Sequence, residues 1–358
     1  MVCQIKYLSN TISRETEAVR VKITVIGAGA IGGVIGAYLS QAGFDVTLVD
    51  TVAEHVHEMN ENGLTICGVR GENTFKVKAV LPEQLSGRQQ MVLLSVKAMA
   101  TRQALEPVLP LLDEHSFVVS MQNGLCEEVI SEMVGAQRTV GCFLQFGADY
   151  LEPGRVMLAY DFPMYIGELD GSVGERLRRC QSILSHVMPI KITNNIWGYL
   201  WAKMCLGSVY FAAALTELPF SQVLALTHVR PLLASIVKET CGVARGLGVR
   251  VEKFKGFDPN LFMEEDLTDA YAQWDQKPDP DSFEGSTLKR FTGIQRDIMV
   301  RKRPTEVDWQ PGIVVKKASQ LGVYAPLNDA IVRMIHEVER AQRVLGVHNL
   351  EELLDLVD

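Results

Sequence analysis

Residues 21–50 read VKITVIGAGAIGGVIGAYLSQAGFDVTLVD, and this stretch decides the fold that the sequence predicts. Its first part, residues 21–26, is largely apolar and β-branched, which is typical of a buried parallel strand. Apolar residues then recur at helical spacing until Gly43, a residue type that commonly ends helices. A second apolar run, residues 44–49, ends at Asp50. The order of strand, glycine-rich turn, helix and strand predicts an α/β fold.

The turn carries glycines with G-x-G-x-x-G spacing, and each glycine has its own task in binding a dinucleotide. Gly27 permits the tight turn from strand to helix, and Gly29 lets a pyrophosphate approach the backbone. Gly32 lets the helix pack closely against the strand. The helix N-terminus offers free N–H groups and a positive dipole end to the phosphates. The loop residues predicted to bind the cofactor are Gly27, Ala28, Gly29, Ala30, Ile31 and Gly32.

Asp50 lies 23 residues after Gly27, at the end of the second predicted strand. A carboxylate at this point accepts hydrogen bonds from a ribose 2′-hydroxyl and repels a 2′-phosphate. We therefore predict a Rossmann dinucleotide-binding unit that prefers NAD, with NADP as the alternative cofactor. An ordinary βαβ unit with a glycine-rich turn is the competing interpretation.

Composition restricts the class of protein. The chain has 358 residues, enough for two domains, and 47% of them are apolar, which indicates a globular protein. The net charge of −8 argues against nucleic acid as a partner. No apolar run approaches the ~20 residues that span a membrane. Residues 1–20 lack the apolar core of a signal peptide, and we interpret them as an N-terminal extension.

The cysteines favour a reducing environment. There are seven, an odd number, and no C-x-x-C pair occurs. This pattern fits reduced thiols in a cytoplasmic protein better than a disulfide framework or a zinc site. We therefore expect buried thiols and no metal ion.

Further apolar runs continue the predicted parallel sheet. They span residues 91–96, 117–121, 140–146 and 191–193, with a hairpin excursion at 64–80 and helices at 52–62, 101–112 and 173–187. Lys97 and Asn123 directly follow two of these strands, at the sheet edge where ligands bind in open α/β folds. Taken alone, Lys97 also fits a surface lysine, and Asn123-Gly124 also fits a simple turn.

The strands stop near residue 194, where we place a domain boundary. Residues 21–193 form the predicted Rossmann-type parallel sheet domain, and residues 194–358 form an all-α domain for substrate binding or dimerisation. The predicted helices of the second domain span residues 196–214, 220–246, 288–300, 313–321 and 328–345. Pro231 marks a start or a kink of the second of these helices. Residues 253–284 are predicted to form a loop or a short-helix excursion.

Three side chains in the second half are candidates for chemistry. Lys203 is the only charged residue between Ile192 and Thr216. A lysine in such an apolar helix either extends its ammonium to water or serves a function in the protein. Desolvation lowers a lysine pKa toward neutrality, which suits proton donation. Glu306 also fits an ordinary acid at a helix start, and Ser286 also fits a plain N-cap.

Together these motifs resemble the ketopantoate reductase (2-dehydropantoate 2-reductase) family. The motifs occur in the order found in the family. GAGAIGG spans residues 27–33, SVK spans 95–97 and MQNG spans 121–124. Lys203 follows a tryptophan-rich helix start, and PTEVD spans residues 304–308. The resemblance covers residues 21–345. The combination of Lys203 with Thr305-Glu306 is much more specific than the N-terminal motifs, which several dehydrogenase families share.

The resemblance implies an active site in the cleft between a Rossmann domain and a helical domain. It implies that Lys203 is the general acid that protonates the substrate carbonyl oxygen while the nicotinamide supplies a hydride from C4. By the same match, Glu306 lies near the cofactor and helps to position the lysine. Lys97 and Asn123 line the cleft, and Ser286 holds the substrate.

The chain departs from the family pattern at three points. Members commonly carry asparagines four and eight residues after the lysine, and Gly207 and Phe211 stand there instead, which favours a more apolar substrate side chain. An arginine near the end of the second strand, typical for NADP, is replaced by Asp50. The segment between Ser286 and Glu306 is longer than usual.

The sequence therefore predicts an NAD(P)H-dependent oxidoreductase that reduces 2-dehydropantoate, or a related and more apolar 2-oxo acid, to a 2-hydroxy acid. An NAD-dependent D-2-hydroxyacid dehydrogenase on the same fold is the alternative within enzymes. A dinucleotide-sensing protein without catalysis is the alternative of another class. We expect a small-molecule 2-oxo or 2-hydroxy acid as partner and allow for a homodimer.

Overall fold

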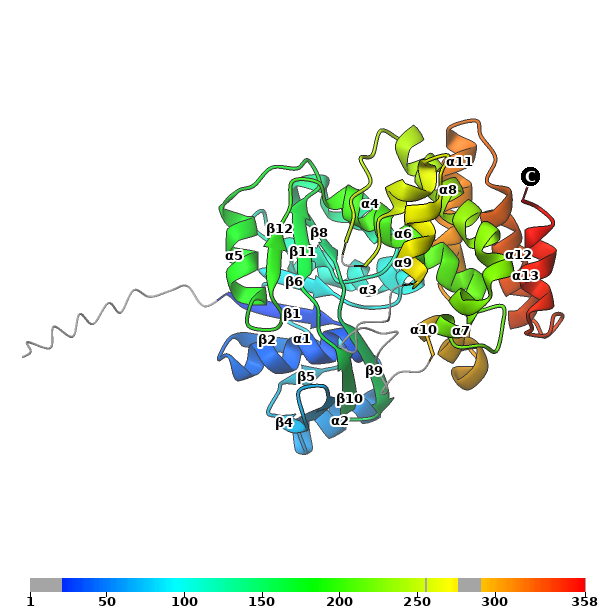
Figure 1. The fold of residues 1–358 in the computed structure, drawn as a ribbon. Helices are drawn as coiled ribbons and strands as arrows, with labels where there is room; N and C mark the ends of the chain where they lie inside the picture. Colours follow the sequence, from blue (N-terminus) through cyan, green and yellow to red (C-terminus); the bar gives the residue numbers. More distant parts are fainter. Residues whose placement is uncertain (1–20, 255, 276–290, 358) are drawn as a thin grey trace, which may run out of the picture.

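The computed structural model describes residues 21–254, 256–275 and 291–357 of the chain. The N-terminal extension predicted for residues 1–20 lies outside the described residues. Two β-sheets with their flanking helices occupy one side of the molecule, and the helices from α6 onward occupy the other (Figure 1). This arrangement confirms the predicted fold class, a parallel-sheet part followed by a helical part.

The main sheet has eight strands in the order β12-β11-β8-β7-β6-β1-β2-β5. All neighbouring pairs are parallel except β8 and β11. The strands are β1 (Lys22–Ile26), β2 (Asp45–Val49), β5 (Ala79–Val80), β6 (Met91–Leu94), β7 (Phe117–Ser120), β8 (Thr139–Phe143), β11 (Met164–Glu168) and β12 (Ile190–Ile192). Helices cover the sheet, so β6, β7 and β8 are buried at every position, as continuous apolar runs predict.

The glycine-rich turn joins β1 to α1 (Ala30–Gln41) with the geometry that its three glycines predict. Gly27 has a φ of 90°, a conformation that glycine adopts at little cost. A Cβ on Gly32 would lie 1.9 Å from the Gly27 carbonyl oxygen, so α1 packs directly against the turn. A Cβ on Gly29 would meet no atom within 4 Å. The backbone at Gly29 is therefore open to a ligand.

A second sheet of four strands, in the order β4-β3-β10-β9, packs beside α1. Its strands are β3 (Leu64–Gly68), β4 (Asn73–Phe75), β9 (Gly147–Glu152) and β10 (Arg155–Tyr160). The predicted hairpin at 64–80 corresponds to β3 and β4, while residues 79–80 leave it to join the main sheet. The hairpin of β9 and β10, which turns at Gly154, was not predicted, because its exposed and buried residues alternate only in part.

Four helices complete the sheet-containing part: α2 (Ala53–Glu61), α3 (Thr101–Leu105), α4 (Cys126–Val134) and α5 (Glu175–Leu184). The predicted helix at 101–112 is wrong in its second half, where residues 106–111 form a 3₁₀ segment. Pro107 and Pro110 explain this change, since proline has no N–H to donate within an α-helix.

The helical part is built around α6 (Ile196–Ala213), in which 13 of 18 residues are buried. This helix packs against β8, β11, α8, α11 and α12. The other helices are α7 (Phe220–Ala225), α8 (Arg230–Gly246), α9 (Thr268–Asp275), α10 (Gly293–Arg296), α11 (Pro311–Gln320), α12 (Pro326–Glu339) and α13 (His348–Leu354). The described part of the chain contains no helix that combines the length and the apolarity needed to cross a membrane.

Three helix predictions in this part need correction. The helix predicted at 220–246 is divided into α7 and α8, and Pro231 stands at the start of the second one. Residues 293–301 form one short α-helical turn followed by a π-helical turn, and residues 288–290 lie outside the described residues. The helix predicted at 328–345 ends after Glu339, and α13 was not predicted because residues 346–354 carry only a short apolar repeat.

The substitution Gly32→Ala tests the close packing of α1 on the turn. Alanine favours helices, but its methyl group would overlap the Gly27 carbonyl oxygen. We expect a net loss of roughly 1–3 kcal/mol in the free energy of unfolding, measured by urea titration. Gly29→Ala is the matched control and should change stability by less than about 0.5 kcal/mol. Equal stability of Gly32→Ala and wild type would contradict this packing.

Candidate active site

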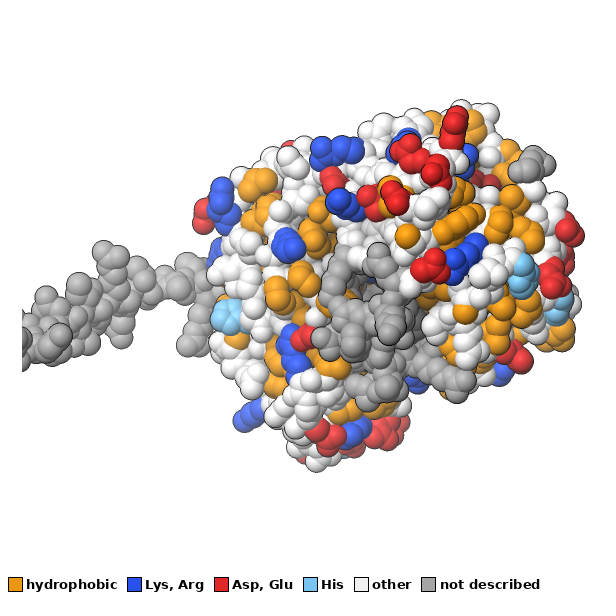
Figure 2. All heavy atoms as spheres, in the orientation of Figure 1, with side chains coloured by type: hydrophobic (Ala, Val, Ile, Leu, Met, Phe, Trp, Pro, Cys, Tyr) orange, Lys and Arg blue, Asp and Glu red, His pale blue; other side chains and the backbone are white. Residues whose placement is uncertain are grey.

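One cavity of about 1670 Å³ lies between the two parts of the molecule. It is lined by the glycine-rich turn, by the ends of β2, β6, β7 and β8, by β9, and by α6, α7 and the segment around residue 306. The volume exceeds the ~300–1,000 Å³ of ordinary ligand pockets. A dinucleotide and a second molecule therefore have room in it together. Figure 2 shows acidic and basic side chains intermixed over the described surface of the face in view.

The residues of the glycine-rich turn, predicted from the sequence to bind a cofactor, divide into two groups. Gly27, Gly29, Ala30 and Ile31 line the cavity, as does Asp50. Ala28 and Gly32 belong to the same turn but are buried and do not line the cavity. The structure thus brings Asp50 to the same cavity as the loop.

The Asp50 carboxylate is held by two backbone groups. One oxygen accepts a hydrogen bond from the Ala28 N–H at 2.9 Å, and the other accepts one from the Val52 N–H at 3.0 Å. These contacts fix the carboxylate at the end of β2, where it faces the loop. A fixed negative charge at this position disfavours a further anionic group nearby.

His55, which the sequence gave no reason to single out, braces the loop from behind. Its ring is fully buried, with Nε2 3.0 Å from the Ala28 carbonyl oxygen. The Gly154 N–H donates to Nδ1 at 2.9 Å, so the ring proton must be on Nε2. His55 thereby connects the glycine-rich turn to the turn of the second sheet. No local pattern could reveal this role, because Gly154 is 99 residues away.

Lys97 and Glu306 meet in the cavity although 209 residues separate them. The Lys97 ammonium donates to a Glu306 oxygen at 2.9 Å, and the Ala98 N–H donates to the other oxygen at 2.8 Å. Glu306 is nearly fully buried, so these two donors satisfy it. Burial alone would lower the pKa of Lys97, but Glu306 and Asp297 outweigh it and raise that pKa.

Lys203 lies on the cavity side of α6. Its ammonium donates a hydrogen bond to the Leu144 carbonyl oxygen at 2.7 Å and lies 5.7 Å from the centre of the Phe143 ring. Burial lowers the pKa of Lys203 to about 8, against the influence of Cys142, Glu306 and Glu127. An ammonium has three hydrogens, so the Leu144 contact leaves hydrogens available for a ligand. The arrangement can deliver a proton near neutral pH.

The remaining predicted residues are placed as follows. Asn123 and Gly207 line the cavity. Phe211 does not, because it is 0% exposed and packed in the helical core. A residue eight positions after Lys203 is turned about 80° away from it around a helix with 3.6 residues per turn. The prediction that Phe211 contacts substrate is therefore corrected. Ser286 lies outside the described residues.

Two cavity residues that the sequence did not suggest are Tyr210 and Gln310. Tyr210 is seven positions after Lys203, almost two full turns, so it shares the lysine's side of α6. Gln310 reaches toward Gly207, and its side-chain oxygen would lie 2.7 Å from a Cβ at that position. An amide thus occupies the space that Gly207 leaves empty. Only the fold brings these residues together.

Apolar side chains from the helical part also line the cavity. They include Tyr210, Phe220, Leu224, Trp274 and Ile294, with the polar residues Ser221, Gln273 and Asp275 next to them in the chain. The rings of Tyr210 and Phe220 meet edge to face, with their centres 4.5 Å apart. These apolar side chains favour contact with an apolar or aromatic group.

A cluster of ion pairs joins the two parts of the molecule beside Glu306. Asp297, only 1% exposed, accepts from Lys97 at 3.1 Å and from Arg301 and Arg303 at 2.9 Å. Arg301 also pairs with Asp149 on β9. Burial opposes ionisation of Asp297, but the three cations outweigh it and hold its pKa below the usual range.

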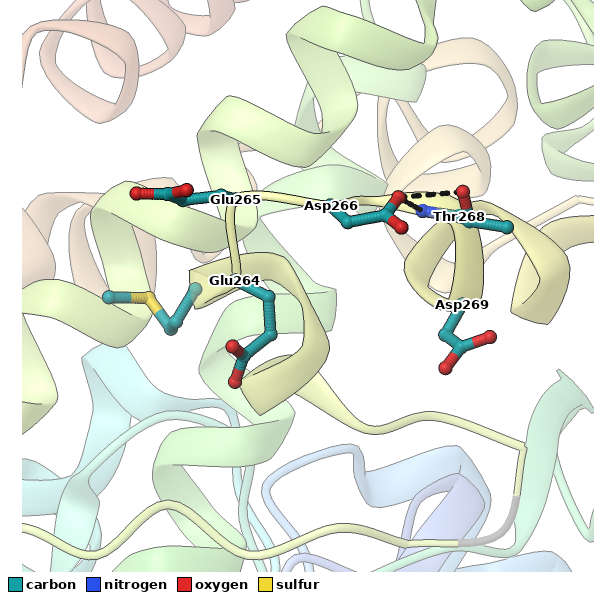
Figure 3. A pocket seen from close by; sticks show the side chains of 6 residues that line it. Glu264, Glu265, Asp266, Thr268 and Asp269 are labelled. Atoms are coloured by element: carbon teal, nitrogen blue, oxygen red, sulfur yellow. Dashed lines mark hydrogen bonds between the residues drawn. The ribbon is translucent and has the colours of Figure 1, made fainter.

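A separate acidic hollow lies at residues 263–269 (Figure 3). Asp266 accepts hydrogen bonds from the backbone and hydroxyl of Thr268, while Glu264, Glu265 and Asp269 point in different directions. The carboxylates do not converge on one point. Accordingly, the described residues include no group of three His, Cys, Asp or Glu side chains arranged to hold a metal ion.

Comparison with known families gives two matches. The family described as Ketopantoate reductase PanE/ApbA matches residues 23–171. The family described as Ketopantoate reductase PanE/ApbA C terminal matches residues 195–339. Together they span the glycine-rich turn, Lys97, Lys203 and Glu306.

Individual relatives agree with these matches. A 2-dehydropantoate 2-reductase of Lactococcus lactis subsp. lactis (strain IL1403) is 26% identical over 326 residues, 89% of this chain and 98% of that protein. D-mandelate dehydrogenase with NADH and anilino(oxo)acetate has a similar fold, with a TM-score of 0.78 at 22% identity over 90% of this chain and 99% of that one. A PanE/ApbA family ketopantoate reductase from Ralstonia eutropha JMP134 gives 0.74 at 23% identity, with the same coverage.

The substitution Asp297→Asn tests the ion-pair cluster. It leaves three cations without their shared counter-charge, and we expect a loss of at least about 2 kcal/mol in the free energy of unfolding at pH 7. This is a low value for a buried pair, because Lys97 and Arg303 are partly exposed and can be rehydrated. Urea titration measures the loss, with Asp266→Asn on the acidic loop as the control that should cost less than about 0.5 kcal/mol.

The pH dependence of the same loss follows from the direction of the Asp297 pKa shift. A carboxyl whose pKa is lowered by folding stabilises the protein above its unfolded-state pKa, and this stabilisation disappears as pH falls through the folded-state pKa. The difference between Asp297→Asn and wild type should therefore stay constant from about pH 5 to pH 8. A difference that vanished within this range would contradict the assignment.

Proposed function

This chain belongs to the ketopantoate reductase family of oxidoreductases, and we propose that it reduces an apolar 2-oxo acid to a 2-hydroxy acid with NADH. In this reaction the keto carbon gains a hydride and the keto oxygen gains a proton, while NADH becomes NAD⁺. One observation carries the proposal. A lysine with a lowered pKa opens into the same cavity as a glycine-rich dinucleotide loop.

The loop fits a dinucleotide. Gly29 leaves its backbone open at the start of α1, where N–H groups and the helix dipole favour a pyrophosphate. The fixed Asp50 carboxylate suits a ribose with free hydroxyls and disfavours a 2′-phosphate, which supports NAD over NADP. In this proposal residues 21–193 hold the cofactor, and the bound nicotinamide supplies the hydride.

Lys203 acts as the general acid. Its ammonium, anchored on the Leu144 carbonyl, donates a proton to the keto oxygen as negative charge develops there. The Phe143 ring and the apolar residues of α6 lie beside the ammonium, and this less polar surrounding strengthens the electrostatic stabilisation. Leu144 fixes the direction of the ammonium, so the proton is offered into the cavity.

Glu306 acts through its neighbours. It holds Lys97 and the backbone at Ala98 directly beside the end of β6, where the nicotinamide end of the cofactor would lie. Its negative charge also favours the protonated form of Lys203. We assign Asn123 to the same wall of the cavity, as a polar contact for cofactor or substrate.

The substrate side chain is proposed to be apolar. Apolar residues of the cavity wall support this choice, because Tyr210, Phe220 and Trp274 offer rings for contact. Gly207 itself adds no side chain, and the Gln310 amide beside it can bind the polar end of a 2-oxo acid. The resemblance to 2-dehydropantoate 2-reductases keeps 2-dehydropantoate as the reference substrate.

A second candidate is an NAD-dependent D-2-hydroxyacid dehydrogenase, which performs the same chemistry in the oxidative direction. The fold shared with D-mandelate dehydrogenase and the apolar residues of the cavity wall favour it. A sensor without catalysis is disfavoured, because binding alone requires no lysine with a pKa near 8. Use of the helical part in a homodimer stays a prediction.

The substitution Lys203→Ala tests the general acid. We expect turnover of a 2-oxo acid to fall by roughly 10²- to 10⁴-fold while NADH binding, measured by fluorescence, is retained. Lys203→Arg should remain impaired, since a guanidinium does not release its proton near neutral pH. Lys191→Ala removes a lysine outside the cavity and should leave turnover intact. Near-normal turnover of Lys203→Ala would refute the assignment.

Cofactor choice depends on the charge of Asp50 in this proposal. Asp50→Asn keeps the size of the side chain and one hydrogen-bond acceptor but removes the charge. We expect the preference for NADH over NADPH to fall by roughly tenfold or more, as loss of one repulsive charge implies. The measurement is kcat/KM with each cofactor at fixed salt. A wild-type protein that prefers NADPH would refute the role of Asp50.

A further inference from the structure

The ion-pair network at the junction between the two parts of the molecule contains more cations than carboxylates. Among the described residues, contacts join four cations to three carboxylates. The cations are Lys97, Arg296, Arg301 and Arg303, and the carboxylates are Asp149, Asp297 and Glu306. One positive charge of this network is therefore not compensated within it. An anionic ligand in the adjoining cavity would compensate that charge.

Arg303 is the cation of this network whose charge is compensated least. Its Nε and Nη2 atoms both donate to one oxygen of Asp297, at 3.0 and 2.9 Å, and Arg301 donates to the same oxygen at 2.9 Å. Lys97 and Arg301, by comparison, each contact two carboxylates. The Arg303 side chain is 48% exposed and lines the cavity. A guanidinium has five N–H groups, so its contacts with Asp297 leave others for a ligand.

The backbone brings Arg301 and Arg303 to the same carboxylate oxygen. Residues Asp297–Arg301 form a π-helical turn, and Lys302 follows with a φ of 50°, in the left-handed region that residues other than glycine rarely adopt. Turns and backbone conformations of this kind are frequent at functional sites. Lys302 itself is exposed and does not line the cavity. Of three consecutive basic residues, the first and the third thus line the cavity.

A first series of contacts connects the glycine-rich turn to this network along the edge of the main sheet. A Cβ on Gly27 would lie only 2.9 Å from the Val96 nitrogen, so the turn packs directly on the chain after β6. The next residue, Lys97, donates to Asp297 at 3.1 Å. Two residues after the strand therefore span the distance from the turn to the ion pairs.

A second series of contacts runs through the smaller sheet. His55, which binds a carbonyl oxygen of the turn, packs its ring edge to face against Tyr150, with the ring centres 5.0 Å apart. Tyr150 directly follows Asp149 on β9, and Asp149 pairs with Arg301. Arg301 also donates to Asp297. The turn and the ion pairs are thus connected through two different elements.

We propose, on the basis of the proposed function, that Arg303 binds the pyrophosphate of the dinucleotide from the helical part of the molecule, while the glycine-rich turn binds it from the sheet part. Both series of contacts lead from the turn to Asp297, the carboxylate that holds Arg303. The turn offers N–H groups at the start of α1, and Arg303 adds charge-assisted hydrogen bonds. The pyrophosphate supplies the negative charge that the network lacks.

The test compares ligands with and without a pyrophosphate and requires no turnover. ADP-ribose and NADH contain this group, and adenosine does not. Calorimetric titration gives the Kd of each ligand. We expect Arg303→Gln to weaken the binding of ADP-ribose and of NADH by roughly tenfold and to leave adenosine binding unchanged. Lys302→Gln removes the same charge at the next position and should leave all three Kd values at the wild-type level.

The Arg303→Gln variant should fold, because Asp297 keeps its contacts with Lys97 and Arg301 and the network then has equal numbers of cations and carboxylates. Arg303→Lys is the second variant. It keeps the charge but loses the planar fork, so we expect a roughly threefold weaker binding of ADP-ribose. If only the lysine variant folds, wild-type affinity for ADP-ribose in that variant would overturn the proposal.

Two results with a folded Arg303→Gln variant would also overturn it. One is an unchanged Kd for ADP-ribose. The other is equal weakening of adenosine and ADP-ribose, which would show that the substitution disturbs the whole cofactor site and removes no contact with the pyrophosphate.

Turnover distinguishes this inference from the proposed function. If wild type binds NADH and ADP-ribose but reduces no 2-oxo acid, the proposed function fails, while a selective loss of ADP-ribose binding in Arg303→Gln still supports the pyrophosphate site. If Arg303→Gln raises only the KM for an active 2-oxo acid, the guanidinium binds the substrate carboxylate, and the inference is overturned while the proposed function stands. A wild type that binds neither NADH nor ADP-ribose would overturn both.

Discussion

The structure depends on one constraint, which is the cost of keeping a single ammonium group on a buried apolar helix. Lys203 is the only charge on α6, and α6 is the helix around which the C-terminal part packs. The lost hydration of the Lys203 ammonium is offset by a hydrogen bond to the Leu144 carbonyl oxygen at 2.7 Å, by the Phe143 ring and by nearby carboxylates. The lowered lysine pKa that remains is what a proton donor needs.

The same principle organises the junction between the two parts of the molecule. Asp297 and Glu306 come from the C-terminal part, whereas Lys97 comes from the sheet edge, and their charges meet out of water. Asp149 of the second sheet joins through Arg301. These contacts join the two parts of the molecule beside the cavity, so the site is complete only when both parts are folded against each other.

The features that depend on residues close together in the sequence could be predicted. The glycine spacing predicted the turn, the open backbone at Gly29 and the place of Asp50, and the lone charge on an apolar segment singled out Lys203. The features that could not be predicted depend on contacts between residues far apart in the sequence. His55 is explained only by Gly154, and the space at Gly207 only by Gln310. Phe211 was misplaced because an eight-residue step leaves the helix face that Lys203 and Tyr210 share.

The central claim is that this site reduces an apolar 2-oxo acid with NADH. The most direct test is the initial rate of NADH and NADPH oxidation by the purified protein with 2-dehydropantoate and with 2-oxo-2-phenylacetate, at equal concentrations and fixed pH. The account predicts that kcat/KM is highest for 2-oxo-2-phenylacetate with NADH. Turnover of 2-dehydropantoate alone, with NADPH as the preferred cofactor, would contradict it.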